Sequence, residues 1–550
     1  VLGECALLGA LAGALGVALG TGMAALALRL LAGDLGGGYF SGAAPPLLFD
    51  AAAACLCAGL GLVAAVVGGY GPAERAGRLA PAQALKGLGG QDQGVPAVWP
   101  GLSLMLLGGL LALVPPIAGL PLAAYACVAA WLVGGISLVP AVVHGLLGRR
   151  SARPARHALW LLALQRARFF RGTATAAVAG VVASLALCVA LTVMVASFRQ
   201  AVTDWLTTVL PADLYVRAGG AGASAAQLVF PQGLPDRVAA LPGVLRVTGA
   251  RSVTLSLSAS LPELGLQARP LGDRPEQVLP LVDLPLPLPA ALRPGVVPVF
   301  VSEAVLALHG VQPGQTWRLP LTDERGQAVT VWVRGVYRDY ARQFGSVAMD
   351  LADYQRLTGD RRLNDLALWL APGTAPAPLQ DQIRAQTEQL GAASQALAFA
   401  STAQLRQISL QIFDRSFAVT RYLQAVAIAI GLAGVAASLS AQVLARQREF
   451  GLLAHLGLTR AQVMRLVLME TAAWLLAGLA VGLALGLLIS AVLVHVVNPQ
   501  SFHWTMPLQV PVGPVAGLLA AVLLAGLGTA ALTARRALSA DAVRAVKEDW

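Results

Sequence analysis

The chain has 550 residues, of which 57% are apolar and only 12% are charged, and its mean hydropathy is +0.68. A soluble protein of this length needs far more charged surface, so the composition indicates a membrane protein. The formal net charge of +11 would also suit a nucleic-acid-binding protein. Residues 200–418, however, carry 18 basic and 18 acidic side chains. The positive excess lies instead in short stretches beside apolar runs, which argues against nucleic acid.

Apolar runs that could cross a membrane are the main feature of the chain, since about 20 residues span the roughly 30 Å of hydrocarbon. Eight such runs lie at 5–31, 47–69, 99–115, 118–145, 173–197, 419–443, 466–496 and 510–533. The third is the shortest, and Pro115-Pro116 separates it from the fourth, as in a tight turn between antiparallel helices. We therefore predict a polytopic α-helical membrane protein with about eight transmembrane helices.

Basic residues predict the orientation of these spans. Most of the arginines outside residues 200–418 fall in the segments 70–98, 146–172, 444–465 and 534–550. The opposite short loops, 32–46 and 497–509, hold no Lys or Arg. Eight alternating spans then leave both termini in the cytoplasm and residues 200–418 outside the inner membrane.

Residues 200–418 read as a large, mixed α/β extracytoplasmic domain. Strands are expected where β-branched or alternating residues run between Gly, Pro and Asp, at 244–258, 297–301, 317–321 and 328–336. Helices are expected at 302–308 and 379–390, and the repeated Leu-Pro of 280–294 indicates an extended loop.

The two ends of the chain resemble each other. Aligning Glu4 with Glu470 also aligns Gly16 with Gly482 and Gly20 with Gly486. Glycines four residues apart let membrane helices approach closely. The predicted helix-packing positions are Glu4, Gly16, Gly20, Glu470, Gly478, Gly482 and Gly486.

A second match links the basic tails after the following helices, so that 1–88 and 467–547 look like two copies of one helix pair. The second copy is preceded by a further span and a cytoplasmic helix, which the first copy lacks. The simplest account is that an upstream helix, with or without a first outer domain, is missing from this chain; the alternative is a natural short form.

Residues 446–465 predict an amphipathic cytoplasmic helix, with apolar Phe450, Leu453 and Leu456. A break at Gly457 is followed by Thr459, which suits the N-cap of the next helix. Two interpretations remain open: a helix lying in the lipid headgroups, or a docking surface for a cytoplasmic partner.

The stretch RQREFGLLAHLGLTRAQVMRLVLMET, followed by a Gly-spaced helix, resembles the C-terminal domain of FtsX-like permeases, the transmembrane subunits of MacB/Lol-type ABC transporters. The stretches VFVSEAVLALHGVQPGQTWRL and VRGVYRDYARQFGSVAMD resemble the periplasmic domain of the same group. The resemblance implies five parts: the back half of a first FtsX-like domain (1–88), an extra helix pair (89–156), an amphipathic lead-in and span (157–198), a MacB-like periplasmic domain (199–418) and a C-terminal FtsX-like domain (419–550).

The resemblance also implies that a separate cytoplasmic ATPase dimer docks on the cytoplasmic helix and binds ATP and Mg, so that this chain needs no cofactor. The implied contact residues are Arg448, Glu449, Phe450, Gly451, Leu452, Leu456, Gly457 and Thr459. Glu4 and Glu470 match the acidic residue of the family's second helix, which should face protein rather than lipid. Segment 157–171 is interpreted as interfacial. A second permease copy or a periplasmic protein are further possible partners.

Catalytic motifs are missing from the sequence. The only two lysines, Lys86 and Lys547, follow no G-x-x-x-x-G-K-[ST] pattern, so a phosphate-binding P-loop is excluded. The six histidines show no zinc spacing, the lone Cys55-x-Cys57 has no second pair, and no G-x-S-x-G occurs. The chain is therefore predicted to be no enzyme.

The leading hypothesis is a permease that couples ATP hydrolysis in its partner to export or extraction of a lipid, lipoprotein or small molecule. The alternative is an FtsX-type regulatory scaffold that activates a cell-wall hydrolase through the outer domain. The size of that domain favours transport. A membrane-embedded enzyme is a third possibility, for which the intramembrane acids and histidines are too few.

Overall fold

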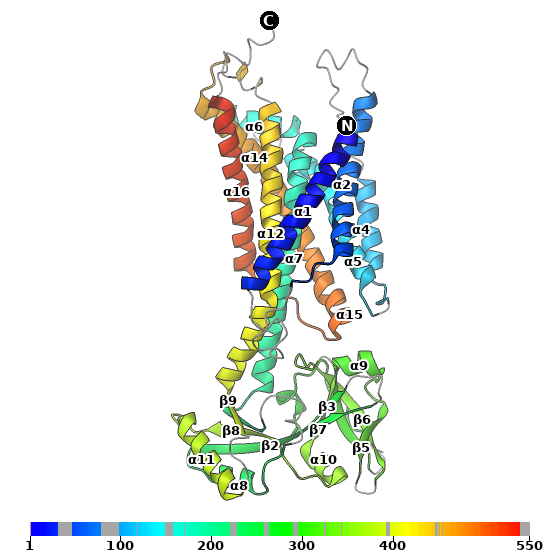
Figure 1. The fold of residues 1–550 in the computed structure, drawn as a ribbon, viewed down its shortest axis with the longest axis vertical. Helices are drawn as coiled ribbons and strands as arrows, with labels where there is room; N and C mark the ends of the chain where they lie inside the picture. Colours follow the sequence, from blue (N-terminus) through cyan, green and yellow to red (C-terminus); the bar gives the residue numbers. More distant parts are fainter. Residues whose placement is uncertain are drawn as a thin grey trace.

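The computed structural model joins a bundle of long helices to a mixed α/β domain at one end (Figure 1). It describes residues 2–30, 47–78, 98–117, 119–148, 158–169, 171–219, 228–257, 263–289, 295–323, 326–342, 344–391, 397–445, 449, 452–453 and 455–539. The bundle helices are α1 (Leu2–Leu30), α2 (Ala51–Arg78), α4 (Trp99–Leu111), α5 (Leu122–Gly148), α6 (Ala158–Phe169), α7 (Arg171–Val209), α12 (Thr402–Ala445), α14 (Arg460–Val492), α15 (Asn498–Phe502) and α16 (Val512–Ser539).

Seven helices within the described ranges are long and apolar enough to cross a membrane. The predicted span at 99–115 is the exception, because α4 has only 13 residues, about 20 Å of helix. Pro100 lies in the first turn of α4, and a turn before Pro115 ends the helix. The prediction of about eight transmembrane helices, the third the shortest, thus agrees with seven long helices and one short apolar helix within the described residues. α4 and α5 still form the expected antiparallel pair, in which Trp131 donates to the Met105 carbonyl at 2.9 Å.

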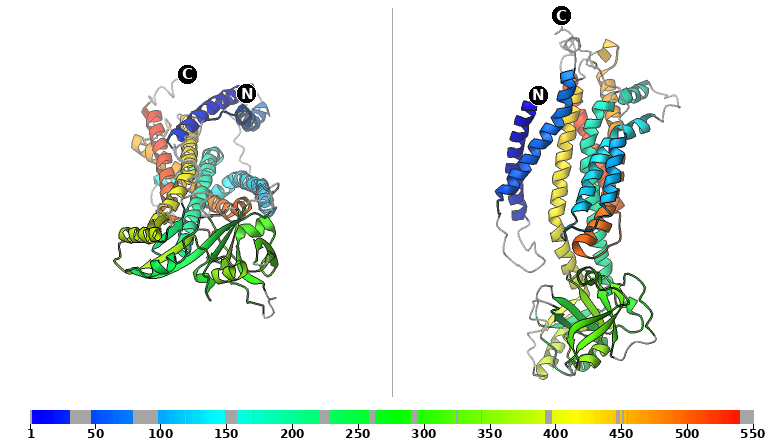
Figure 2. Two further views of the ribbon diagram at one scale, coloured as in Figure 1. Left: turned by 60° about the horizontal axis from the view of Figure 1, so that its bottom comes forward. Right: turned by 90° about the vertical axis from the view of Figure 1, so that its right-hand side faces the viewer.

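The bundle has a central group of helices and a peripheral hairpin. Apolar side chains of α7, α14 and α16 pack in one cluster, and those of α5, α7 and α14 in another. Figure 2 shows α1 and α2 as a hairpin beside α12, where Tyr422 donates to the Met23 carbonyl at 3.1 Å. The start of α1 and the end of α16 both lie at the end of the bundle away from the α/β domain (Figure 1).

Two helices continue from the bundle into the α/β domain. α7 has 39 residues and α12 has 44, which correspond to about 58 and 66 Å. The predicted spans 173–197 and 419–443 are the apolar parts of these longer helices. The expected domain borders at 199 and 418 therefore fall inside continuous helices, which form a stalk.

The α/β domain contains one nine-stranded mixed sheet, in the order β5-β6-β4-β7-β3-β2-β8-β1-β9. The strands are β1 (Leu214–Ala218), β2 (Val244–Leu255), β3 (Leu264–Arg269), β4 (Val297–Ser302), β5 (Thr316–Thr322), β6 (Ala328–Tyr337), β7 (Ser346–Asp350), β8 (Asp365–Leu370) and β9 (Leu397–Ser401). The pairs β3–β7 and β4–β6 are parallel, and the other neighbours are antiparallel.

Four short helices cover one face of this sheet: α8 (Leu234–Ala239), α9 (Glu303–His309), α10 (Leu351–Thr358) and α11 (Pro376–Gln389). Leu234 and Ile383 pack with Leu366 of β8, and Val305 packs with Leu266 of β3. The mixed α/β prediction is confirmed, with β2, β4, β5, β6, α9 and α11 at the expected places. β1, β3, β7, β8 and β9 were not predicted.

Candidate functional site

The connecting segment is defined as residues 446–459 between α12 and α14. Its described residues, 449, 452, 453 and 455–459, lie at the end of the bundle away from the α/β domain (Figure 1). Of the residues expected to contact an ATPase, the structure describes Glu449, Leu452, Leu456, Gly457 and Thr459. The remaining three lie outside the described residues: Arg448, Phe450 and Gly451.

A turn and a capping box fix the path of this segment into α14. Gly457 has φ +95°, a left-handed conformation that favours glycine. The Thr459 hydroxyl accepts from the Gln462 amide at 3.3 Å, and the Gln462 side chain accepts from the Thr459 amide at 2.8 Å. This reciprocal pair satisfies two backbone donors that a helix start leaves open. The predicted break and N-cap are therefore present.

The leucines of the connecting segment divide between two sides. Leu453 and Leu458 pack against Val467 of α14 and its neighbours. Leu452 and Leu456 point away, with 61% and 77% of their surface exposed. The segment is thus attached to α14 on one side and presents two apolar side chains on the other.

Arg166 of α6 forms ion pairs with both the connecting segment and α14. Its guanidinium lies 2.9 Å from the Glu449 carboxylate and 3.5 Å from that of Glu470. Glu470 is buried, with 3% of its side chain exposed. Trp474 adds a hydrogen bond to the Ala167 carbonyl at 3.2 Å. The helix α6, expected to be interfacial, therefore packs on α14, and the expectation that Glu470 faces protein agrees with its burial.

Sequence reasoning missed Arg166 because it stands among several arginines that share the same basic stretch. Nothing in its local spacing separates it from Arg168 or Arg171. Its acceptor Glu449 is 283 residues away in the chain. Only the packing of α6 on α14 identifies it.

The glycines Gly478, Gly482 and Gly486 lie along the side of α14 that faces α7. The nearest α7 side chains are, in the same order, those of Val178, Leu185 and Val189. A Cβ at these glycines would meet them at 2.5, 3.0 and 2.7 Å. The two helices therefore approach as closely as the absence of side chains allows.

The first copy of the repeat differs from the second. Among the described residues, no atom of another helix comes within 4 Å of a Cβ built at Gly16 or Gly20. The close approach to α2 involves Gly9 and Gly13 instead, because α2 lies against the earlier part of α1. Glu4 is exposed, whereas Glu470 is buried. The expectation that Gly16 and Gly20 are packing positions therefore disagrees with this structure.

At the other end of α14, an aromatic cluster joins the bundle to the α/β domain. It contains Phe198, Trp205, Tyr340, Phe413, Phe417 and Trp504. Trp205 of the stalk donates to the Arg338 carbonyl at 3.0 Å. Thr505, between α15 and α16, binds both Glu303 and Tyr340 of the α/β domain. The residues that follow α14 are thus held to the α/β domain by packing and by hydrogen bonds.

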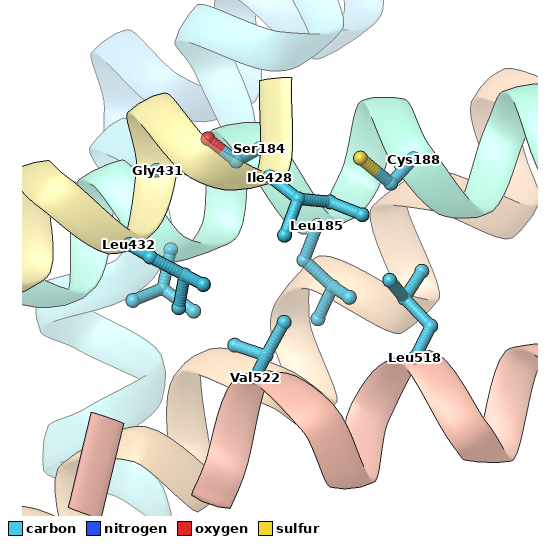
Figure 3. A pocket seen from close by; sticks show the side chains of 9 residues that line it. Ser184, Leu185, Cys188, Ile428, Gly431, Leu432, Leu518 and Val522 are labelled. Carbon is cyan, nitrogen blue, oxygen red and sulfur yellow. The ribbon is translucent and has the colours of Figure 1, made fainter. Parts of the chain in front are cut away.

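The gap between α7, α12 and α16 is narrow (Figure 3). Apolar side chains such as Leu185, Ile428 and Val522 line it, and its volume is about 10 Å³. That is about the space of one water molecule, so nothing larger fits in this gap in the present conformation. Within the described residues, no three His, Cys, Asp or Glu side chains gather as metal ligands would.

Two known protein families match this chain, one mainly in its α/β domain and one in its C-terminal helices. The MacB-like periplasmic core domain matches residues 174–386, and the FtsX-like permease C-terminal domain matches residues 423–542. An uncharacterized ABC transporter permease protein of Mycobacterium tuberculosis is 28% identical over 344 residues. That match covers 60% of this chain and 38% of the relative, so the chain spans well under half of the relative's length.

Two solved structures are also similar. The periplasmic region of MacB from Actinobacillus actinomycetemcomitans is 12% identical with a TM-score of 0.26, covering 37% of this chain and 94% of that one. The extracellular domain of the noncanonic ABC-type transporter YknZ from Gram-positive bacteria is 13% identical with a TM-score of 0.24. That match covers 34% of this chain and 98% of the YknZ domain.

Proposed function

We propose that the chain is the permease subunit of an ABC transporter whose ATPase is a separate cytoplasmic subunit. The matches of residues 423–542 to the FtsX-like permease C-terminal domain and of residues 174–386 to the MacB-like periplasmic core domain support this proposal. The partner ATPase dimer binds ATP and Mg. This chain binds the ATPase at the connecting segment and works on a lipid, lipoprotein or small molecule on the periplasmic side of the inner membrane. Both termini are then cytoplasmic.

The observation that carries this proposal is the division of the leucines in the connecting segment. Leu453 and Leu458 attach it to α14, while Leu452 and Leu456 are exposed at the end of the bundle. A partner that covers these exposed leucines removes their apolar surface from water, and this burial favours binding. A movement imposed on them would reach α14 directly, since Arg166 ties Glu449 to Glu470.

A movement of the connecting segment can reach the α/β domain only through helices that are stiff and closely packed. α14 runs 33 residues from Thr459 toward the junction, about 50 Å, and glycine contacts hold it close to α7. α7 continues unbroken into the α/β domain. The narrow gap between α7, α12 and α16 supports work by helix movement rather than passage of a substrate between these helices.

The scaffold alternative differs in what the outer domain does. A match to the MacB-like periplasmic core over residues 174–386, together with the nine-stranded sheet, supports the transport interpretation. A hydrolase activator would use the same coupling at the cytoplasmic end, so only an assay of the outer domain's partner separates the two.

The test is co-purification of the full chain with its candidate ATPase, comparing wild type with Leu452→Asp plus Leu456→Asp. We expect the double variant to fold normally, because both leucines are exposed. It should lose association and ATPase stimulation by at least about tenfold, because burying two carboxylates in an apolar contact is costly. Leu245→Asp is the matched control, since Leu245 is 68% exposed in the α/β domain. Unchanged association in the double variant would refute the proposal.

A further inference from the structure

The face of the sheet opposite α8, α9, α10 and α11 contains a polar cavity of about 190 Å³. Its lining includes Arg217, Ser252, Thr254, Gln267, Arg342 and Asp365. Side chains alternate along a strand, and Leu266 and Leu366, the neighbours of Gln267 and Asp365, belong to the helix-covered core. The cavity therefore lies on the polar face of the domain, at the other end of the molecule from the connecting segment (Figure 1).

Arg342 lies across the sheet because Gly265 leaves space for it. A Cβ at Gly265 would stand 2.9 Å from the Arg342 Cδ, and glycine in a strand often marks such a close approach. The guanidinium donates to Asp339 at 3.2 Å and to Gln267 when that amide oxygen is turned toward it. It is thus fixed from two sides, and 37% of the side chain remains exposed.

The two carboxylates beside the cavity already have cationic partners. Asp365 accepts from Arg217 at 2.6 Å and from the Ser252 hydroxyl at 3.0 Å. Asp339 accepts from Arg342 and from two backbone amides. One arginine therefore balances each carboxylate.

Arg269 adds a third cation, close to Asp365 and Arg342. It follows Gln267 by two residues in β3, so its side chain leaves the sheet on the cavity's face. Within the described part of the chain, no Asp or Glu lies within ion-pair distance of it, and the nearby Asp365 already accepts from Arg217 and Ser252. Burial lowers the pKa of the guanidinium and outweighs the opposing effects of Tyr215, Tyr337 and Asp365, yet arginine stays protonated in proteins. A partly buried cation of this kind is unfavourable unless an anion joins it.

We propose that this cavity binds an oxyanion, a phosphate or carboxylate group of a small ligand, with Arg342, which lines it, as the cationic contact and the nearby charge of Arg269 adding to the attraction. Guanidinium groups bind both kinds of anion through paired N–H donors. The Thr254 hydroxyl lines the cavity and makes no hydrogen bond within the described residues, so it adds a neutral donor. The volume is more than ten times the roughly 10–15 Å³ that one water molecule needs by the same measure, which leaves room for the group that carries the anion.

The test uses the full chain in detergent, with thermal unfolding followed in sodium phosphate, glycerol phosphate or sodium acetate against sodium chloride of equal ionic strength. We expect a saturable rise in unfolding temperature with at least one oxyanion, as for any ligand of the folded state. Arg269→Gln plus Arg342→Gln should abolish that rise. Arg384→Gln on α11, which contacts the other face of the sheet at Phe399, should retain it.

Comparing the rise in unfolding temperature among the three anions distinguishes the kinds of ligand that could supply the oxyanion. A stronger effect of glycerol phosphate than of phosphate points to a lipid headgroup, the reverse to free phosphate, and an effect of acetate alone to a carboxylate. No saturable rise with any of them, or an equal rise in the double variant, overturns the proposal.

A single variant distinguishes a ligand contact from a structural role. Without oxyanions, Arg269→Gln should unfold at the same temperature as wild type or higher, because it removes a partly buried cation that has no carboxylate within ion-pair distance among the described residues. A clearly lower unfolding temperature in chloride would assign Arg269 to the fold rather than to a ligand, and would also overturn the proposal.

Discussion

The Glu303 carboxylate, in the first turn of α9, accepts hydrogen bonds from both the backbone amide and the hydroxyl of Thr505, at 2.9 and 2.6 Å. Tyr340 donates to the carbonyl of the same threonine at 2.9 Å. All three polar groups of Thr505 are therefore used by the α/β domain. Since Thr505 lies between α15 and α16, these bonds join the bundle to the sheet.

Glu303 should make the junction more stable in mild acid. Burial raises the pKa of this carboxyl, although the Thr505 bonds oppose that effect. In the unfolded chain the carboxyl ionises at its lower, ordinary pKa, so its charge destabilises the folded state at neutral pH, and acidification removes that cost. From about pH 7 to about pH 5, we expect the unfolding temperature of wild type to rise relative to that of Glu303→Gln.

Thermal unfolding of both proteins over this pH range checks the prediction. Glu276→Gln, which removes one exposed carboxylate of the same domain, is the matched control for the change in net charge. A difference between wild type and Glu303→Gln that stays constant with pH would contradict it.

Local chemistry made part of the structure predictable from sequence. Length and composition identify the long spans because lipid requires apolar side chains along the whole segment. The turn at Gly457 and the cap at Thr459 are equally local, and both are present. The polar ends of α7 and α12 were missed because their helical state depends on the domain that they carry rather than on an apolar run.

The unpredicted strands have partners far away in sequence. β1 has five residues and pairs with β8 and β9, which follow it by about 150 residues or more. So short a run gives little period-2 signal, and its burial comes from Leu379 and Ile383 of α11. Arg166 was missed for the same reason, since its partners are set by how α6 packs on α14.

Removing Arg166 should destabilise the bundle through Glu470. Arg166→Met leaves the buried Glu470 carboxylate without its arginine, and breaking a buried ion pair in this way costs about 3 kcal/mol. Glu470→Gln in the same background should recover part of the loss. Arg356→Met, which breaks an exposed pair with Asp353, should cost about 0.5 kcal/mol or less. Thermal unfolding compares the variants, and equal losses for the buried and exposed pairs would contradict the expected role.

Gly457 should control how the exposed leucines are presented. Gly457→Ala forces a side chain into the left-handed region at φ +95°, at a cost of about 1–2 kcal/mol. We expect reduced stimulation of the partner ATPase, because the turn fixes the path of the connecting segment into α14. Gly457→Asn is the matched variant, since asparagine tolerates this region better. Equal activity of the alanine and asparagine variants at a wild-type level would show that the turn conformation is unimportant.

Gly486 and Gly20 occupy the same position in the two copies of the repeat but have different surroundings. A Cβ at Gly486 would lie 2.7 Å from the Val189 Cβ and 2.8 Å from the Ala186 carbonyl oxygen, so α7 and α14 must separate. We expect Gly486→Ala to cost about 1–3 kcal/mol, as overpacking does. At Gly20 a Cβ meets no described atom within 4 Å, and Gly20→Ala should be neutral or stabilise α1 by up to about 1 kcal/mol. Thermal unfolding in detergent and in lipid bilayers measures both. A loss at Gly20 as large as that at Gly486 would mean that another helix packs on this side of α1 in the membrane, as α7 does on α14.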